Sequence, residues 1–271
     1  MRAKRDFKGK VAVITGAAGG MGQALSRRFG MAGAKLAVTD LDAGAVMEFS
    51  RALSEEGIKS VGIGLDVTDE SACRRTMDEI KKRFGRIDLL INNAGITHRS
   101  AFVKTNPAVY RRVMDVNYFG PLYCTKAAFD SLLENRGLII VISSIAGFAP
   151  LLGRTGYSAS KHALHGLFDS LRAEVKESGV GITLVCPGFT ATNIEQNALG
   201  GDGCPTTHPQ SKVGRSATPE SVAEAVYLAA CKDKRLLVLS TVGRLTRLMT
   251  RSFPFLYEWL MARSLRSELE R

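Results

Sequence analysis

Short apolar runs alternate with longer segments of helical periodicity along most of this chain. Seven runs rich in Val, Ile and Leu read, in order, VAVITG, KLAVTD, SVGIGLDV, IDLLINNAG, GLIIVISS, VGITLVCPG and RLLVLS. The segments between them, such as QALSRRFGMAGA and SACRRTMDEIKKRFG, place apolar residues at helical spacing. Continuous apolar strands separated by helices indicate a mainly parallel sheet that is covered on both faces. The pattern therefore predicts a doubly wound α/β domain with a seven-stranded sheet.

The length and composition fit one soluble domain. A chain of 271 residues with 45% hydrophobic and 23% charged residues can bury one large core. The first residues lack the apolar region and the cleavage site of a signal peptide. No segment contains the run of about 18 apolar residues that is needed to cross a bilayer. We therefore expect a cytoplasmic protein. The cysteines are scattered without a Cys-x-x-Cys pair, so we expect free thiols at Cys73, Cys124, Cys186, Cys204 and Cys231.

The net charge of +11 is concentrated toward the end of the chain. From Lys232 to Arg271, nine Lys and Arg oppose four Asp and Glu, so this segment supplies +5 of the total. The rest is spread without a basic run interleaved with aromatic residues, and no nucleic-acid-binding motif accompanies it. We therefore expect no nucleic-acid partner.

A glycine-rich loop follows the first apolar run. In TGAAGGMGQAL, Gly16, Gly20 and Gly22 open a helix at the carboxyl end of a strand, where doubly wound sheets bind their ligands. Glycines there allow a tight turn and a close approach of a pyrophosphate to the free N–H groups of the helix. The spacing is Gly-x-x-x-Gly-x-Gly rather than Gly-x-Gly-x-x-Gly, so the loop alone fits a structural turn as well as a nucleotide site.

Asp40 ends the second apolar run, 24 residues after Gly16. This is close to the spacing of roughly 20 residues at which an acid contacts the adenosine ribose. A carboxylate there accepts hydrogen bonds from ribose hydroxyls and repels a 2′-phosphate. No Lys or Arg lies between Gly16 and Gly22, and Leu41 follows Asp40, so the sequence favours NAD over NADP. The alternative for Asp40 is that it caps the next helix.

Tyr157 and Lys161 lie four residues apart in TGYSASKHALHGLFDSLRAEV, a segment with helical periodicity. Residues at this spacing share one helix face, so the lysine charge can reach the tyrosine hydroxyl. A nearby cation favours the phenolate, which moves the tyrosine pKa from about 10 toward neutrality and suits proton transfer. Taken alone, the pair also fits an ordinary exposed tyrosine beside a solvated lysine.

Together these motifs resemble, in order and spacing, the short-chain dehydrogenase/reductase family, a Rossmann-type fold, from Lys10 to about Ser240. Asn117 in MDVNYFG and Ser144 in VISSIAG, thirteen residues before Tyr157, belong to the pattern. The resemblance implies that Asp66 and Val67 hold the adenine and that Thr192 contacts the nicotinamide. The cofactor-binding residues that it implies are Thr15, Gly16, Gly20, Met21, Gly22, Asp40, Asp66, Val67, Asn93, Ala94, Gly95, Tyr157, Lys161, Pro187, Gly188 and Thr192.

The resemblance also assigns the catalytic roles. Tyr157 exchanges the alcohol proton, Ser144 hydrogen-bonds the carbonyl oxygen, and Lys161 binds the ribose and lowers the Tyr157 pKa. Asn117 links Lys161 to solvent through water, although asparagine also interrupts helices. Adjacent strand residues face opposite sides, so Ser143 is expected to have a structural role. His162 and His165 share a helix face without a third ligand, so we expect no metal.

The end of the chain departs from the common pattern of the family. In TVGRLTRLMTRSFPFLYEWLMARSLRSELER we expect two helices separated at Pro254, because proline breaks the first and suits the opening of the second. Three interpretations of their apolar residues stay open: a lid or internal packing, a subunit contact, or an interfacial membrane helix. We expect residues 1–240 to form the catalytic body and residues 241–271 a helical extension of the same domain. The Gly- and Pro-rich segment from Asn193 to Glu220 is expected to be a mobile lid.

The predicted function is that of an NAD-dependent oxidoreductase that interconverts a secondary alcohol and a ketone. The apolar tail suggests a hydrophobic substrate of the hydroxysteroid, retinoid or 3-oxoacyl type. The resemblance further implies a homodimer or homotetramer, and the basic tail adds a peripheral membrane contact as an alternative. A non-catalytic NAD-binding or membrane-associated scaffold is the second hypothesis, although such a role needs only the loop and Asp40.

Overall fold

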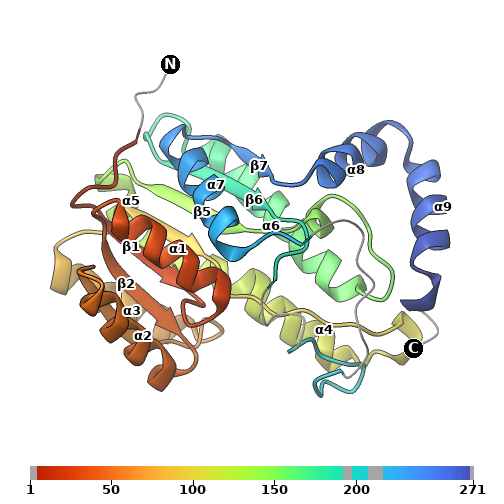
Figure 1. Cartoon of the computed structure of the whole chain (residues 1–271), viewed down its shortest axis with the longest axis horizontal. Coiled ribbons are helices and arrows are strands. Elements are labelled where there is room, and N and C mark those ends of the chain that lie inside the picture. Colours follow the sequence, from red (N-terminus) through yellow and green to blue (C-terminus); the bar gives the residue numbers. More distant parts are fainter. Residues whose placement is uncertain (1–4, 192–196, 207–215, 269–271) are drawn as a thin grey trace.

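The computed structural model describes residues 5–191, 197–206 and 216–268. Seven strands form one sheet in the order β3-β2-β1-β4-β5-β6-β7, and all neighbouring strands are parallel (Figure 1). The order reverses beside β1, which confirms the predicted doubly wound sheet. The strands are β1 (Val11–Thr15), β2 (Lys35–Asp40), β3 (Ser60–Gly64), β4 (Leu89–Asn92), β5 (Leu138–Ile142), β6 (Gly181–Cys186) and β7 (Leu236–Val238).

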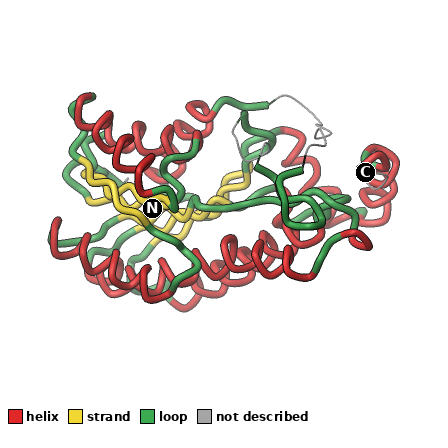
Figure 2. The backbone as a smooth tube through the Cα atoms, turned by 90° about the horizontal axis from the view of Figure 1, so that it is seen from below, coloured by secondary structure: helices red, strands yellow, loops and turns green. Residues whose placement is uncertain are grey.

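Helices cover both faces of this sheet (Figure 2). They are α1 (Gly20–Met31), α2 (Ala43–Glu55), α3 (Glu70–Phe84), α4 (Pro107–Met114), α5 (Gly120–Glu134), α6 (Thr155–Glu174), α7 (Pro219–Cys231), α8 (Thr241–Ser252) and α9 (Pro254–Ser264). One buried cluster contains side chains of α1, α2 and α7, and the other contains side chains of α3, α5 and α6. Ala12 and Ile14 of β1 belong to the first cluster, whereas Val11 and Val13 belong to the second. Burial on both faces explains why the strands read as continuous apolar runs.

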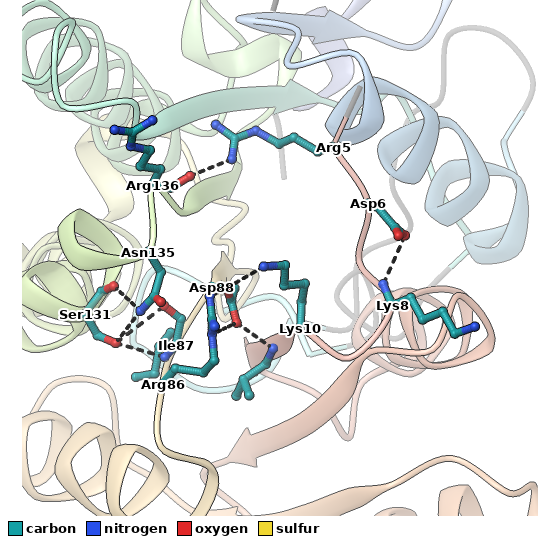
Figure 3. A network of polar contacts seen from close by, with 11 residues as sticks. Arg5, Asp6, Lys8, Lys10, Arg86, Ile87, Asp88, Ser131, Asn135 and Arg136 are labelled. Carbon is teal, nitrogen blue, oxygen red and sulfur yellow. Dashed lines mark hydrogen bonds and ion pairs between the residues drawn. The ribbon is translucent and has the colours of Figure 1, made fainter. Parts of the chain in front are cut away.

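A polar network closes the sheet at the amino ends of its central strands (Figure 3). The buried Asp88 accepts hydrogen bonds from the backbone N–H of Val11 (3.0 Å) and from Nε of Arg86 (2.8 Å). Lys10 Nζ lies 3.5 Å from the same carboxylate, and Arg5 donates to the carbonyl of Arg136 (2.8 Å). A buried carboxylate is stable only with such partners. The network holds the amino ends of these strands in place, whereas the candidate site lies at their carboxyl ends.

The C-terminal extension consists of α8 and α9, which lie at the end of the molecule far from α2 and α3 (Figure 1). Ser240 caps α8 by accepting a hydrogen bond from the N–H of Gly243 (2.9 Å). Pro254 is the first residue of α9, as expected from its fixed φ angle. Within the described residues, no helix combines the length and apolar character needed to span a bilayer.

Candidate active site

The glycine loop between β1 and α1 is fixed by close backbone contacts. Gly16 has a left-handed φ of 65°, and a Cβ there would lie 2.8 Å from Cα of Ala94. A Cβ on Gly22 would lie only 2.2 Å from the carbonyl oxygen of Gly16. Asn93 Nδ2 donates to the carbonyls of Thr15 and Gly16, both at 2.9 Å. The loop therefore requires glycine at two positions and is held by the residue that follows β4.

Asp40 lies beside this loop, at the carboxyl end of β2. Its Oδ2 accepts a hydrogen bond from the N–H of Ala18 (2.9 Å), which fixes the carboxylate against the loop. The cap of α2 is Asp42, whose Oδ1 accepts from the N–H of Ala45 (3.0 Å), so Asp40 does not cap that helix. Leu41 is 73% exposed at the rim of the same cavity. Asp40 is thus free of a helix-capping role and faces the space where a nucleotide would lie.

Asp66 and Val67 follow β3 and line the same cavity. Asp66 Oδ1 accepts hydrogen bonds from the N–H (2.9 Å) and the hydroxyl (2.7 Å) of Thr68, which orients the turn. Val67 is buried against Gly120, the first residue of α5, where a Cβ would lie 2.8 Å from Cγ2 of the valine. An apolar side chain next to a carboxylate suits a purine ring.

Ser144 and Tyr157 face each other across the cavity. Ser144 follows β5, and its hydroxyl is close enough to the hydroxyl of Tyr157, in the first turn of α6, to act on the pKa of the tyrosine. The Ser144 oxygen also accepts from the N–H of Ala146 (3.1 Å), so its rotamer is fixed. Two hydroxyls at one point of a cavity can bind a single substrate oxygen.

Lys161 is buried one helical turn after Tyr157. Its Nζ donates to the carbonyl of Ile142 (3.0 Å) and lies 5.7 Å from the centroid of the Tyr157 ring. Burial lowers the pKa of Lys161 to about 8. Burial also raises the pKa of Tyr157, although the nearby Ser144 hydroxyl and the charge of Arg154 act in the opposite direction. The expected lowering of the tyrosine pKa is therefore not found, because burial of the tyrosine itself raises its pKa.

Asn117 is fully buried in a π-helical turn, η2 (Asp115–Phe119), between α4 and α5. Its Oδ1 accepts from the N–H of Ile96 (2.8 Å), and its Nδ2 donates to the carbonyl of Ile96 (2.9 Å) and to Ser160 Oγ (3.0 Å). A Cβ on Gly95 would lie 3.2 Å from Asn117 Oδ1 and 3.6 Å from Lys161 Nζ. Asn117 therefore lies where the helix is interrupted, in agreement with the second interpretation, whereas its water link to Lys161 stays a prediction.

Ser143 also lines the cavity, but its hydroxyl is paired with a neighbouring side chain, as expected for a structural partner. It is buried, and its hydroxyl lies 3.1 Å from Nε2 of His165. Nε2 of His165 is also 3.6 Å from Sγ of Cys186, at the end of β6. Burial lowers the pKa of His165 to about 4 and raises the pKa of Cys186 to about 12, so both groups are neutral at pH 7. All five cysteines are free thiols, as predicted.

One cavity of about 1720 Å³ connects these residues with the C-terminal extension. Its nucleotide end is lined by the glycine loop and Asp40, and it also contains Met21, Pro187 and Gly188. Its other end is lined by apolar side chains of the two last helices, namely Leu245, Met249, Tyr257, Leu260 and Met261. Tyr257 Oη donates to the carbonyl of Pro150 (3.1 Å), which ties α9 to the loop before α6. The extension therefore covers the site, in agreement with the lid interpretation. Thr192 and much of the predicted lid segment lie outside the described residues.

His98 lies in the region of the site and was assigned no role in the sequence analysis. It is fully buried, and its Nε2 accepts a hydrogen bond from the N–H of Gly156 (2.9 Å), next to Tyr157. α6 has no side-chain cap at Arg154, so His98 supplies the cap from a distant loop. A Cβ on Gly156 would lie 3.0 Å from this nitrogen. Burial and the charge of Arg154 lower the pKa of His98 to about 4, which keeps the ring neutral.

We expect His98→Leu to lower kcat about tenfold, because the first turn of α6 and the Tyr157 hydroxyl lose their anchor. His98→Gln restores an acceptor and should recover most of the loss, whereas KM for the nucleotide should not change in either variant. The neutral histidine stabilises the fold fully above about pH 6.5, and this contribution is lost as the pH falls toward 4. Steady-state kinetics and denaturation curves between pH 4 and 7 check both effects. Equal kcat in all three proteins would contradict the positioning role.

A doubly wound sheet with a glycine loop at its switch point and a Ser–Tyr–Lys group beside it defines a dinucleotide-dependent oxidoreductase. Residues 10–201 match the family described as short chain dehydrogenase. The chain is 38% identical over 247 residues to dehydrogenase/reductase SDR family member 7B of Bos taurus, covering 89% of this chain and 76% of that protein. The protein of the same name from Xenopus tropicalis is 36% identical over 276 residues, covering 99% and 89%. The chain therefore belongs to the short-chain dehydrogenase/reductase family.

Solved structures show the same fold. A short chain dehydrogenase/reductase from Burkholderia phymatum, in complex with NAD, superposes with a TM-score of 0.83 at 24% identity, covering 93% of this chain and 96% of that one. An alcohol dehydrogenase from Thermococcus sibiricus, complexed with 5-hydroxy-NADP, superposes with a TM-score of 0.73 at 26% identity, covering 85% and 94%. Similar structures thus hold cofactors of both the NAD and the NADP type.

Proposed function

We propose that the protein interconverts a secondary alcohol and a ketone on an apolar substrate, with NAD(H) as the hydride carrier. The cavity is the observation that carries this proposal, because its nucleotide end and its apolar end meet at Ser144 and Tyr157. Hydroxysteroids, retinoids and 3-oxoacyl compounds have the required combination of a polar oxygen and an apolar body. A panel of these compounds, followed by nicotinamide absorbance, tests the proposal, and turnover of hydrophilic sugars alone would contradict it.

Each residue of the site has its own role in the proposed hydride and proton transfer. NAD(H), when bound, supplies or accepts the hydride. Ser144 and Tyr157 hold the substrate oxygen, and Tyr157 transfers its proton. Because burial raises the pKa of Tyr157, the phenol keeps its proton at neutral pH, which suits donation to the oxygen of a ketone. Lys161 holds the ribose, and Asn117 keeps the Gly95–Ile96 backbone in place beside it.

The proposed preference for NAD rests on Asp40. Its carboxylate is fixed beside the glycine loop, where it can accept hydrogen bonds from ribose hydroxyls and repel a 2′-phosphate. Leu41 is exposed at the same rim and offers no positive charge to a phosphate. The residues present therefore fit the adenosine end of NAD.

Exchanging these two residues tests the preference. We expect Asp40→Ser with Leu41→Arg to raise KM for NADH and to lower KM for NADPH, each by about tenfold, because charge-assisted hydrogen bonds are lost to one cofactor and gained by the other. The matched control is Asp42→Ser, which removes a carboxylate two residues away that caps α2. Steady-state kinetics with both cofactors are measured for all three proteins. An unchanged KM ratio in the double variant would contradict the role of Asp40.

Two further expectations stay predictions. The family resemblance implies a homodimer or homotetramer, which light scattering on the purified protein checks. The predicted cytoplasmic location is checked by fractionating cells that express the full chain.

A further inference from the structure

Helix α9 is apolar on two opposite sides. Tyr257, Leu260 and Met261 line the cavity, whereas Phe255 and Trp259 do not and are 85% and 57% exposed. A helix that is apolar all round is normally buried on all sides. Here the inner side covers the cavity and the outer side lies in solvent, so the outer side requires a partner of its own.

Exposed apolar residues also lie outside α9, at the same end of the molecule. The turn between α8 and α9 adds Phe253, which is 62% exposed, and the single-turn helix η1 (Phe102–Lys104) adds two more residues. η1 lies at the same end of the molecule, because Gly153 accepts a hydrogen bond from Ser100 (2.9 Å) and approaches the backbone of Glu268. We call this surface the apolar end; its residues are Phe102, Val103, Leu248, Phe253, Phe255, Leu256 and Trp259.

The helices of the apolar end are also basic. Residues 241–264 contain four arginines and one glutamate, Glu258. Arg251 and Arg263 are exposed, and the guanidinium of Arg263 lies 5.6 Å from the centroid of the Trp259 ring. Exposed tryptophan and leucine side chains flanked by arginines are the combination that inserts into the interface of a bilayer with anionic lipids.

We propose that the apolar end docks on the surface of an anionic lipid bilayer. A second copy of the chain is the competing occupant, but a two-fold contact would place this net positive surface against itself. An anionic bilayer complements both the charge and the apolar character. Docking places the outer side of α9 in the bilayer interface while its inner side covers the cavity, so an apolar substrate reaches the site without crossing water. This inference does not depend on which substrate the enzyme turns over.

Co-sedimentation of the full chain with vesicles tests the proposal. We expect the protein to sediment with vesicles of phosphatidylcholine and phosphatidylserine, and less with phosphatidylcholine alone or at high salt. Phe255→Ser with Trp259→Ser should lower the partition coefficient at least about tenfold, because two apolar side chains no longer insert. The control is Met31→Ser, which removes a side chain 71% exposed at the end of α1.

A second pair of variants isolates the charge. Arg251→Gln with Arg263→Gln should reduce binding to the anionic vesicles only, whereas Arg51→Gln on the distant α2 should leave it unchanged. NADH binding shows that each variant is folded. The proposal is wrong if the wild-type chain ignores anionic vesicles, or if the Phe255/Trp259 variant binds them as tightly as wild type. An oligomer that this variant dissociates, together with no vesicle binding, would identify a second copy as the occupant.

Discussion

Replacing Tyr157 with phenylalanine is expected to lower kcat by about 10²- to 10⁴-fold, the usual contribution of a positioned acid or base. The ring stays in place at the first turn of α6, and only the hydroxyl that meets Ser144 is lost. The cofactor contacts proposed for the glycine loop and Asp40 do not involve this hydroxyl. NADH affinity should therefore change little, which fluorescence titration measures beside the kinetics.

Tyr123→Phe is the matched control for this experiment. Tyr123 lies on α5, packs against the Phe119 ring at 5.8 Å between centroids, and does not line the cavity. It should keep wild-type kcat, so that a general effect of losing a tyrosine hydroxyl is excluded. Near-normal turnover by the Tyr157 variant would show that Tyr157 is not the proton donor. Absence of turnover by the wild-type protein on every substrate would instead favour the scaffold hypothesis.

Gly22→Ala is expected to destabilise the protein by about 3 kcal/mol or more and to abolish NADH binding. The new Cβ would lie 2.2 Å from the carbonyl oxygen of Gly16 and 2.6 Å from Cα of Ala17, and backbone atoms cannot move aside as a flexible side chain can. The loop must then leave its position beside Asp40 and Asn93. Urea denaturation and NADH titration measure the two effects.

Gly19→Ala distinguishes this steric argument from a general effect of alanine in the loop. Gly19 has φ near −76°, and a Cβ there meets only the carbonyl oxygen of Gly16 at 3.6 Å, an ordinary contact. We expect its free energy of unfolding to stay within about 0.5 kcal/mol of wild type or to increase slightly. Equal destabilisation by Gly19→Ala and Gly22→Ala would show that the loop excludes alanine for a reason other than the steric clash at Gly22.

The sequence predicted all seven strands and the doubly wound topology, because a buried parallel strand needs apolar residues on both faces. It was less precise about where strands end. The run from Ser60 to Val67 contributes only Ser60–Gly64 to β3, and Leu65 and Val67 are buried against α3 and α5 without belonging to a strand. An apolar residue reveals that it is buried, but not whether its backbone pairs with a neighbour.

For the candidate site, too, the sequence predicted some features and could not predict others. Ser144, Tyr157, Lys161 and Asp40 were predicted, and the structure brings them to one cavity, although their roles stay proposals. The direction of the tyrosine pKa shift could not be predicted, because helical spacing does not reveal that the Tyr157 hydroxyl is buried. His98 lies 58 residues before Gly156, and only the folded chain brings the two together. The sequence predicted α8 and α9 and left three interpretations of their apolar residues open, but it did not reveal that α9 has both a cavity side and a solvent side.

The position of β1 between β2 and β4 also determines when the site can form during synthesis. β1, β2 and β3 emerge from the ribosome first, but β1 gains its second neighbour only when Leu89 to Ile91 of β4 pair with it. The glycine loop is held only after Asn93 has followed. Until then a nascent chain exposes one edge of an apolar strand, which is the kind of surface that chaperones protect and that aggregates otherwise. A fragment that stops short of Asn93 is therefore expected to have neither a closed sheet nor a loop that can bind nucleotide.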